Sequence, residues 1–150
     1  MDTVFKLKFF DDLSPQELYA ILQLRNEVFV VEQNCVFQDA DDKDQKCYHL
    51  MGSRNNSLIA YTRIVPPGWI YKEASIGRVV TSPKARGENI GRQLMIKSIE
   101  CLYDLFGQVD IKIGAQKYLK RFYESFDFKQ VSNVYLEDGI EHIYMIRHIS

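Results

Sequence analysis

The sequence predicts a single α/β domain over residues 1–150, in which a mixed sheet is flanked by helices. Segments of alternating or β-branched apolar residues, typical of strands, are interspersed with segments of helical periodicity. Proline and glycine separate these segments where a strand or helix should end. The chain is long enough to bury a substantial core, and its 46% apolar and 26% charged residues favour a folded protein over a disordered one.

The N-terminal part predicts a strand, a helix and an acidic loop. Val4 to Phe10 alternates as a strand does. Ser14-Pro15-Gln16-Glu17 is a capping box with proline at the first helical position, so a helix begins there. Leu24 to Cys35 is too rich in β-branched residues for one continuous helix, and we expect the helix to end there before a second short element. The run from Asp39 to Asp44 is expected to be a solvated loop rather than a recognition surface.

Three strands lie in the middle of the chain. Tyr48 to Ser53 and Leu58 to Val65 are joined through Asn55-Asn56, which suits a turn. Pro66-Pro67-Gly68 then breaks the chain. The apolar, β-branched stretch Ile76 to Thr81 predicts a buried central strand.

A turn and a helix follow this central strand. Ser82-Pro83 ends the strand because proline has no N–H for the ladder, and a tight turn over Arg86 to Gly91 leads into helical periodicity from Ile90 to Ile99. Such a turn directs unpaired N–H groups to one spot, where the helix dipole adds about half a positive charge. The spot therefore suits a phosphate or pyrophosphate, although an ordinary strand-to-helix turn has the same composition. Neither a Walker loop nor a dinucleotide-binding fingerprint is present.

The C-terminal part predicts a strand, a helix and a hairpin. Val109 to Ala115 is apolar as a buried strand is, and Gln116 to Ser125 has helical spacing. Lys129 to Leu136 and Ile143 to Ile149 are the expected arms of a hairpin, with Glu137-Asp138-Gly139 as its turn. The order of elements includes a βαβ crossover after the central strand, which gives a mixed sheet.

Composition and spacing exclude several classes of protein. A net charge of −1 argues against non-specific nucleic-acid binding, and no 18-residue apolar run predicts a membrane span. The N-terminus has no signal-peptide pattern. Cys35, Cys47 and Cys101 cannot all pair within one chain, so reduced thiols in a cytoplasmic protein are expected. Apart from Cys47-x-His49, histidines and cysteines show no paired ligand spacing, and we expect no metal site.

The turn resembles the acyl-coenzyme A (acyl-CoA) binding motif of the GNAT superfamily of N-acetyltransferases, which is Gln or Arg, two residues, Gly, one residue, and Gly or Ala. Here it reads Arg86-x-x-Asn89-x-Gly91, and asparagine is the residue that best tolerates the left-handed conformation after glycine. The element order resembles the GNAT order over the whole chain. Within the superfamily, Val28 to Cys35, the aspartates 39, 41 and 44, and Tyr135 to Met145 are most similar to the ElaA family.

The resemblance implies the GNAT fold, a mostly antiparallel sheet of about seven strands with a splayed central pair. It also implies transfer of an acetyl group from acetyl-CoA to a primary amine by direct attack. The backbone after the central strand and the Arg86 side chain would hold the pyrophosphate, and the edge of the central strand would pair with pantetheine. Gln116 either bonds the cofactor arm or caps a helix. The implied cofactor-binding residues are Val79, Val80, Thr81, Arg86, Gly87, Glu88, Asn89, Ile90, Gly91, Arg92, Gln116 and Phe122.

Tyr123 matches the family's general-acid tyrosine, with Asp127 in place of a glycine that follows in the family pattern. A phenol of pKa near 10 protonating a thiolate near 8.5 is uphill by about 2 kcal/mol, so Tyr123 is expected mainly to stabilise the thiolate by a hydrogen bond. The alternative is a tyrosine packed in the core.

The acceptor amine needs a base, because neutralising a lysine-like amine at pH 7 costs about 4.6 kcal/mol. The candidates are Glu32, Asp41, His49 and His142, of which Glu32 and His142 lie in stretches that carry the resemblance. A structural hydrogen bond is the alternative role of each histidine.

Three classes of acceptor fit the sequence equally: a small amine, an amino sugar and a peptide amine. The oligomeric state also stays open, with a homodimer as one alternative. The rival function is a non-catalytic acyl-CoA-binding sensor or interaction module.

Overall fold

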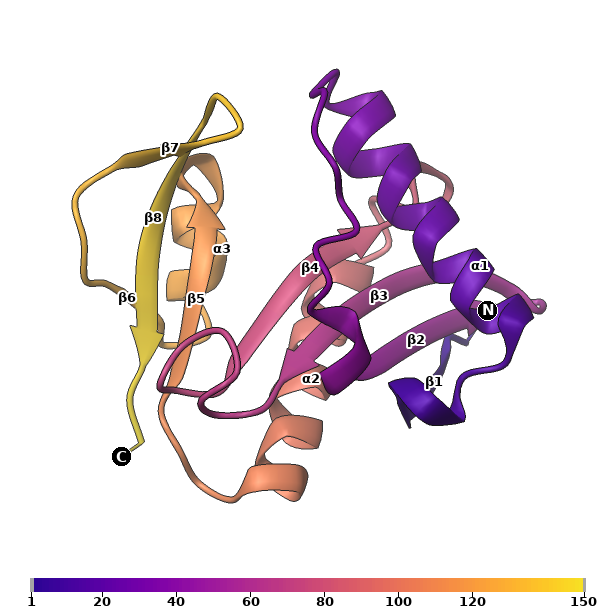
Figure 1. Ribbon diagram of the computed structural model, residues 1–150, viewed down its shortest axis with the longest axis horizontal. Helices are drawn as coiled ribbons and strands as arrows, with labels where there is room; N and C mark the ends of the chain where they lie inside the picture. Colours follow the sequence, from indigo (N-terminus) through magenta and orange to yellow (C-terminus); the bar gives the residue numbers. More distant parts are fainter. Residues whose placement is uncertain (1, 150) are drawn as a thin grey trace.

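The computed structural model describes residues 2–149, which form eight strands and three α-helices. In chain order they are β1 (Val4–Phe9), α1 (Pro15–Arg25), β2 (Tyr48–Arg54), β3 (Ser57–Val65), β4 (Ser75–Thr81), α2 (Ile90–Phe106), β5 (Ile111–Gln116), α3 (Lys120–Glu124), β6 (Lys129–Gln130), β7 (Tyr135–Glu137) and β8 (Ile140–Arg147). Figure 1 shows them arranged as two sheets that diverge from a common base.

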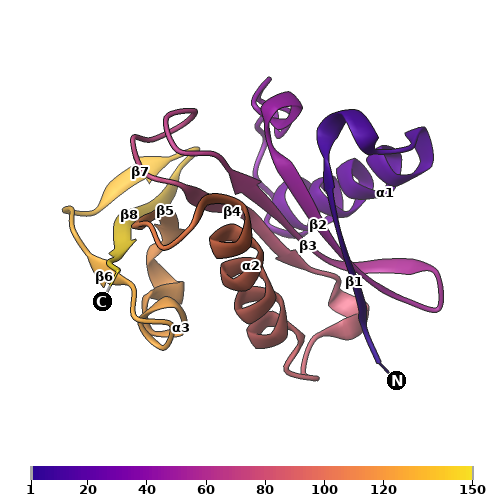
Figure 2. The ribbon, with the colours of Figure 1, turned by 90° about the horizontal axis from the view of Figure 1, so that it is seen from below.

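The first sheet has the antiparallel order β1-β2-β3-β4. Asn55 and Asn56 connect β2 to β3 with φ angles of 51° and 63°, the conformation of a two-residue hairpin turn, so the predicted turn is confirmed. α1 covers one face of this sheet and α2 the other (Figures 1 and 2). The main core lies under α2, where Leu94, Met95 and Leu102 are fully buried.

The start of α1 is confirmed, and the α-helix ends at Arg25, inside the stretch where its end was expected. Ser14 Oγ accepts from the Glu17 N–H at 3.1 Å and Glu17 accepts from the Ser14 N–H at 2.9 Å, which completes the capping box. The second short element is the π-helical segment Asn26–Glu32, which follows α1 without a break. Ile21, Leu24 and Val28 are buried in one cluster along this continuous helix, and that packing outweighs the weak helical preference of the β-branched residues.

The second sheet has the order β5-β8-β6, and β7 pairs with the other end of β8. The turn of the predicted hairpin is confirmed, since Asp138 and Gly139 have φ angles of 51° and 79°. The predicted arms are wrong: β8 begins at Ile140, and the other arm is two short strands instead of one. Ser132 interrupts that arm, because its Oγ accepts the Tyr144 N–H at 2.9 Å in place of a backbone carbonyl.

One point joins the two sheets. A parallel bridge pairs Ala74 with Ile111, and the Lys112 N–H donates to the Ala74 carbonyl at 2.9 Å. Beyond this bridge β4 is the edge of one sheet and β5 of the other, and no ladder joins them within residues 2–149. The splayed central pair of the expected fold is therefore confirmed, in an eight-stranded structure instead of one with about seven strands.

The chain after β5 departs slightly from expectation. β5 is shifted by one or two residues from the predicted Val109 to Ala115, so that Gln116 ends a strand instead of starting a helix. The predicted helix up to Ser125 consists of a 3₁₀ turn at Lys117–Leu119 and the short α3.

Candidate active site

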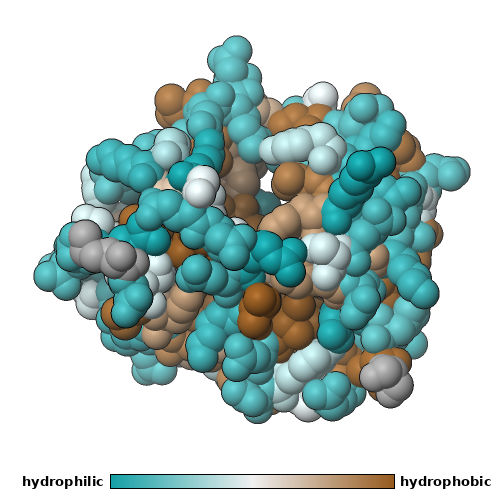
Figure 3. Space-filling view, turned by 180° about the vertical axis from the view of Figure 1, so that it is seen from behind, coloured by the Kyte–Doolittle hydropathy of each residue, from teal (hydrophilic) through white to brown (hydrophobic). Residues whose placement is uncertain are grey.

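A cavity of about 850 Å³ lies where β4 and β5 diverge. Its walls come from these two strands, the π-helical segment and the loop after it, α3, and the β7–β8 hairpin. The space-filling view shows the hollow between the two halves of the molecule, with apolar side chains in its wall (Figure 3). Of the residues predicted from the sequence, those lining the cavity are Glu32, Asp41, Val79, Val80, Thr81, Arg86, Gly91, Gln116, Phe122, Tyr123 and His142, whereas His49, Gly87, Glu88, Asn89, Ile90 and Arg92 do not line it.

The turn before α2 has the conformation that an anion-binding turn needs. Asn89 has φ 61° and Gly87 has φ 86°, so the fourth position of the motif does require the left-handed conformation, which asparagine supplies in place of glycine. None of the N–H groups of Gly87, Asn89, Gly91 and Arg92 donates to an atom of residues 2–149. These donors are open to a ligand at the N-terminus of a 17-residue helix.

The side chain of Arg86 already has a partner. Its Nη1 lies 2.6 Å from Glu32 Oε2 and its Nη2 lies 2.7 Å from Glu32 Oε1, and Nη2 also donates to the Thr81 carbonyl at 3.2 Å. These hydrogen bonds lower the pKa of Glu32 and raise that of Arg86. Glu32, predicted as a candidate base, is thus held as a carboxylate by the arginine predicted to bind pyrophosphate.

Tyr123 lies on α3 with only 6% of its surface exposed, and it lines the cavity. Burial raises the pKa of its phenol above the ordinary value. Its hydroxyl makes no hydrogen bond to any atom of residues 2–149, so the group is a neutral donor available to a ligand. Asp127, four residues later, has φ 67°, so it adopts the left-handed conformation at the position where the family pattern has glycine.

The two candidate histidines lie in different surroundings. His49 is fully buried, with Nδ1 2.6 Å from the Tyr61 hydroxyl and Nε2 3.0 Å from the Asp44 carbonyl oxygen, and burial lowers its pKa. It does not line the cavity. His142 does line it, with Nδ1 2.8 Å from the Ile140 carbonyl oxygen.

The hydrogen bond of His142 fixes its neutral tautomer. A carbonyl oxygen only accepts, so Nδ1 carries the proton and Nε2 keeps a free lone pair. Nε2 lies 3.6 Å from Glu137 Oε2. The imidazole also stacks on the Tyr135 ring, with 5.8 Å between centroids.

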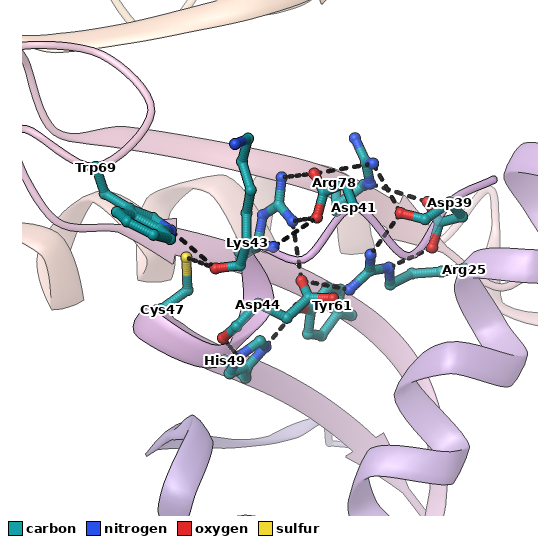
Figure 4. Close-up of polar contacts among 11 residues, drawn as sticks. Arg25, Asp39, Asp41, Lys43, Asp44, Cys47, His49, Tyr61, Trp69 and Arg78 are labelled. Carbon is teal, nitrogen blue, oxygen red and sulfur yellow. Dashed lines mark hydrogen bonds and ion pairs between the residues drawn. The ribbon is translucent and has the colours of Figure 1, made fainter. Parts of the chain in front are cut away.

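The loop at residues 39–44 forms a buried ion network that we define as Arg25, Arg63, Arg78, Asp39, Asp41 and Asp44 (Figure 4). The expectation of a solvated acidic loop is therefore wrong. The loop is held to the face of the first sheet because each aspartate meets two arginines at distances of 2.7 to 3.3 Å. The sequence contains one signal of this network, since Arg25 follows Ile21 and Leu24 on the apolar face of α1.

Arg78 occupies a β-bulge in β4. The register to β3 passes from Tyr61 opposite Val80 to Arg63 opposite Gly77, and Arg78 in between has φ 48°. A left-handed conformation costs a non-glycine residue about 1–2 kcal/mol. The ion pairs of its guanidinium with Asp39 and Asp41 hold it there.

Comparison with known proteins gives consistent matches. Residues 9–149 match the family model described as acetyltransferase (GNAT) domain. The chain is 45% identical to protein ElaA of Escherichia coli (strain K12) over 140 residues, which cover 92% of each chain. It superposes on the crystal structure of an acyl-CoA N-acyltransferase from Pseudomonas aeruginosa with a TM-score of 0.93 and 41% identity, over 97% of this chain and 99% of that one. It superposes on Escherichia coli ElaA with a TM-score of 0.89 and 42% identity, over the same shares.

Among residues 2–149, no three histidine, cysteine, aspartate or glutamate side chains are grouped as metal ligands would be. In the same part of the chain, no helix has the length and hydrophobicity that crossing a membrane requires.

Proposed function

The chain belongs to the GNAT acetyltransferase family and is an acyltransferase, and we propose that it transfers the acetyl group of acetyl-CoA to a primary amine. The observation that carries the proposal is the cavity between β4 and β5, with open N–H donors beside it and the Tyr123 hydroxyl in its wall. The direct attack of the amine on the thioester breaks the C–S bond and forms an amide, which leaves a thiolate and a surplus proton on nitrogen.

Two parts of the chain hold the cofactor in this proposal. The N–H groups of Gly87, Asn89, Gly91 and Arg92 bind the pyrophosphate, and each bond to a charged group contributes about 1.5–3 kcal/mol. The outer edge of β4 over residues 79–81 pairs with the amides of pantetheine, since no strand of residues 2–149 pairs with this edge.

Arg86 completes the pyrophosphate site by exchanging its partner. Its guanidinium leaves Glu32 and binds phosphate oxygens, which form equally good bidentate contacts. Glu32 therefore competes with the cofactor for Arg86 and does not act as the base.

Tyr123 stabilises the departing thiolate. Because burial raises the pKa of the phenol, full proton transfer to sulfur is unfavourable, and the hydroxyl donates a hydrogen bond instead. Such a donor acts where negative charge develops in the reaction.

His142 takes the proton of the amine. Its Nε2 lone pair is free, and this nitrogen lies 3.6 Å from the Glu137 carboxylate in the wall of the cavity. Asp41, another candidate base, is a weaker choice: burial would raise its pKa, but the hydrogen bonds of Arg63 outweigh this effect and lower it.

The experiment that tests the proposal is titration calorimetry with acetyl-CoA, followed by a thiol-release assay over a panel of small amines, amino sugars and peptide amines. We expect binding, and release that depends on the amine. Binding without release by any amine class would favour the alternative, a non-catalytic acyl-CoA sensor or interaction module. We keep the cytoplasm as the proposed location, because Cys35, Cys47 and Cys101 are all free thiols.

A further inference from the structure

We infer that the acceptor amine also carries an anionic group, a carboxylate or a phosphate, and that the guanidinium of Arg78 binds this group inside the cavity. The inference rests on the proposed function of the same cavity. It narrows the acceptor to one chemical class.

Arg78 has one terminal nitrogen left unused. Its Nε lies 2.9 Å from Asp39 Oδ1, and its Nη2 donates to the Asp39 carbonyl at 2.9 Å and to Asp41 Oδ2 at 3.3 Å. Its Nη1 makes no hydrogen bond or ion pair within residues 2–149. In Figure 4 this nitrogen points away from both aspartates. Arg78 lines the cavity and its side chain is 22% exposed, so a ligand can reach it.

The carboxylates next to Arg78 are all engaged. Asp41 Oδ1 accepts from Arg63 at 2.8 Å and from the Lys43 N–H at 3.2 Å, and Asp41 Oδ2 accepts from Arg63 and Arg78. Asp39 Oδ1 faces Arg78, and Asp39 Oδ2 accepts from Arg25 at 2.7 Å. Each of these oxygens thus has at least one cationic partner.

Arg78 is the only guanidinium of the network that lines the cavity among the described residues, since Arg25 and Arg63 are buried beneath it. Asp41 also lines the cavity, but both of its carboxylate oxygens accept from arginines, so the group of the network that is left to bind a ligand there is the Arg78 guanidinium. This polarity favours an anion over a second cation.

A substrate that covers Arg78 must supply an acceptor atom, since a buried charged donor without a partner is costly. Carboxylate and phosphate oxygens match a guanidinium best. A charge-assisted hydrogen bond of this kind corresponds to a preference of about 10- to 100-fold for the anionic amine.

Matched amine pairs test the inference. Calorimetry on the protein saturated with CoA compares pentylamine with 5-aminopentanoate, and glucosamine with glucosamine 6-phosphate. We expect the anionic member of at least one pair to bind about tenfold or more tightly, and the pair that discriminates tells carboxylate from phosphate.

Three variants assign the preference to Arg78. Arg78→Asn removes the charge and keeps a residue that tolerates the left-handed backbone, and the ratio of the two affinities should fall to about one. Arg78→Lys keeps a cation for the aspartates but lacks Nη1, so it should also lose the preference if Arg78→Asn does not fold. Arg121→Gln removes an exposed arginine that does not line the cavity, and it should keep the wild-type ratio.

Equal affinities within both pairs in the wild type, or a preference that survives in both Arg78 variants, would overturn the inference. A weaker Kd for acetyl-CoA in Arg78→Asn with the amine preference intact would assign the guanidinium to the cofactor and overturn it as well. Selective binding of anionic amines without thiol release would instead refute the proposed transfer reaction and leave the anion site standing.

Discussion

Asp44→Asn should destabilise the fold strongly, although Asp44 does not line the cavity. Its Oδ1 accepts from Arg25 Nη1 and from Arg63 Nη1, each at 2.9 Å, and the residue is only 7% exposed. The substitution keeps the size of the side chain but removes its charge. The buried Arg25 and Arg63 and the partly exposed Arg78 then share two carboxylates.

The expected loss of unfolding free energy follows from the removal of one partner in a buried ion network. Breaking a buried ion pair by removing one partner costs about 3–5 kcal/mol, against a total stability of about 5–15 kcal/mol for a typical domain. A domain of this size loses about 2–4 °C of Tm per kcal/mol, so Tm should fall by about 6–20 °C.

Urea and thermal unfolding measure this cost, and Asp42→Asn is the matched control. Asp42 lies in the same loop and loses the same charge, but it is exposed and has φ 61°, which asparagine accepts. We expect the unfolding midpoint of Asp42→Asn to stay at the wild-type value. Equal midpoints for the two variants would refute the idea that the network anchors the loop.

The same network predicts how stability depends on pH. Burial opposes ionisation of Asp41 and Asp44, but hydrogen bonds from the arginines outweigh it, and both native pKa values are lowered. An unfolded aspartate titrates near pH 3.9, so below about pH 4 the unfolded state binds more protons. The stability is therefore complete above pH 4 and is lost as pH falls through the native pKa values. In Asp44→Asn the loss between pH 4 and pH 2 should be smaller, which urea titrations at several pH values would detect.

Four substitutions test the cavity. Gly91→Glu places a carboxylate among the phosphate-binding N–H groups, so the Kd of acetyl-CoA should rise at least about 100-fold; a Cβ there meets Phe122 only at an ordinary 3.7 Å, so circular dichroism should show an intact fold. Tyr123→Phe should lower kcat about 100-fold in the thiol-release assay with little change in KM, and an unaffected kcat would leave Tyr123 with a packing role. His142→Gln should lower kcat/KM at neutral pH, with recovery at high pH where the amine loses its own proton; full activity at pH 7 would remove it as the base. Glu32→Gln should free Arg86 and decrease the Kd of acetyl-CoA in calorimetry, whereas a fall in kcat that recovers at high pH would make Glu32 the base after all.

The local elements of the fold were accessible from the sequence. The capping box, the Asn55-Asn56 turn and the left-handed positions at Asn89 and Asp127 each depend on a few neighbouring residues. Conformational preferences of this kind depend on neighbouring residues alone, so they can be predicted from a short stretch of sequence. The structure confirms each of these features.

The buried network was not accessible in the same way, because its pairs join residues 14 to 39 positions apart. Charged residues in a loop usually face solvent, and only the folded sheet brings Arg63 and Arg78 beneath the aspartates. Likewise, nothing near Arg86 in the sequence identifies Glu32 as its partner, 54 residues away. The interrupted hairpin arm also depends on a distant contact, that of Ser132 with Tyr144.

The single bridge between Ala74 and Ile111 has a mechanical consequence for the whole molecule. Side chains from both sheets pack in the main core, but within residues 2–149 the backbones of the two sheets pair at this bridge alone. The six residues of β5 extend about 20 Å from it, so a rotation of about 5° moves their far end by about 1.7 Å. At that far end, two hydrogen bonds cross the gap among residues 2–149. Gln116 donates to Gln33 at 3.3 Å, and the Cys35 thiol donates to the Asp138 carbonyl at 3.2 Å. A molecule bound between β4 and β5 and bonded to both would therefore add contacts where few hydrogen bonds of residues 2–149 cross the gap.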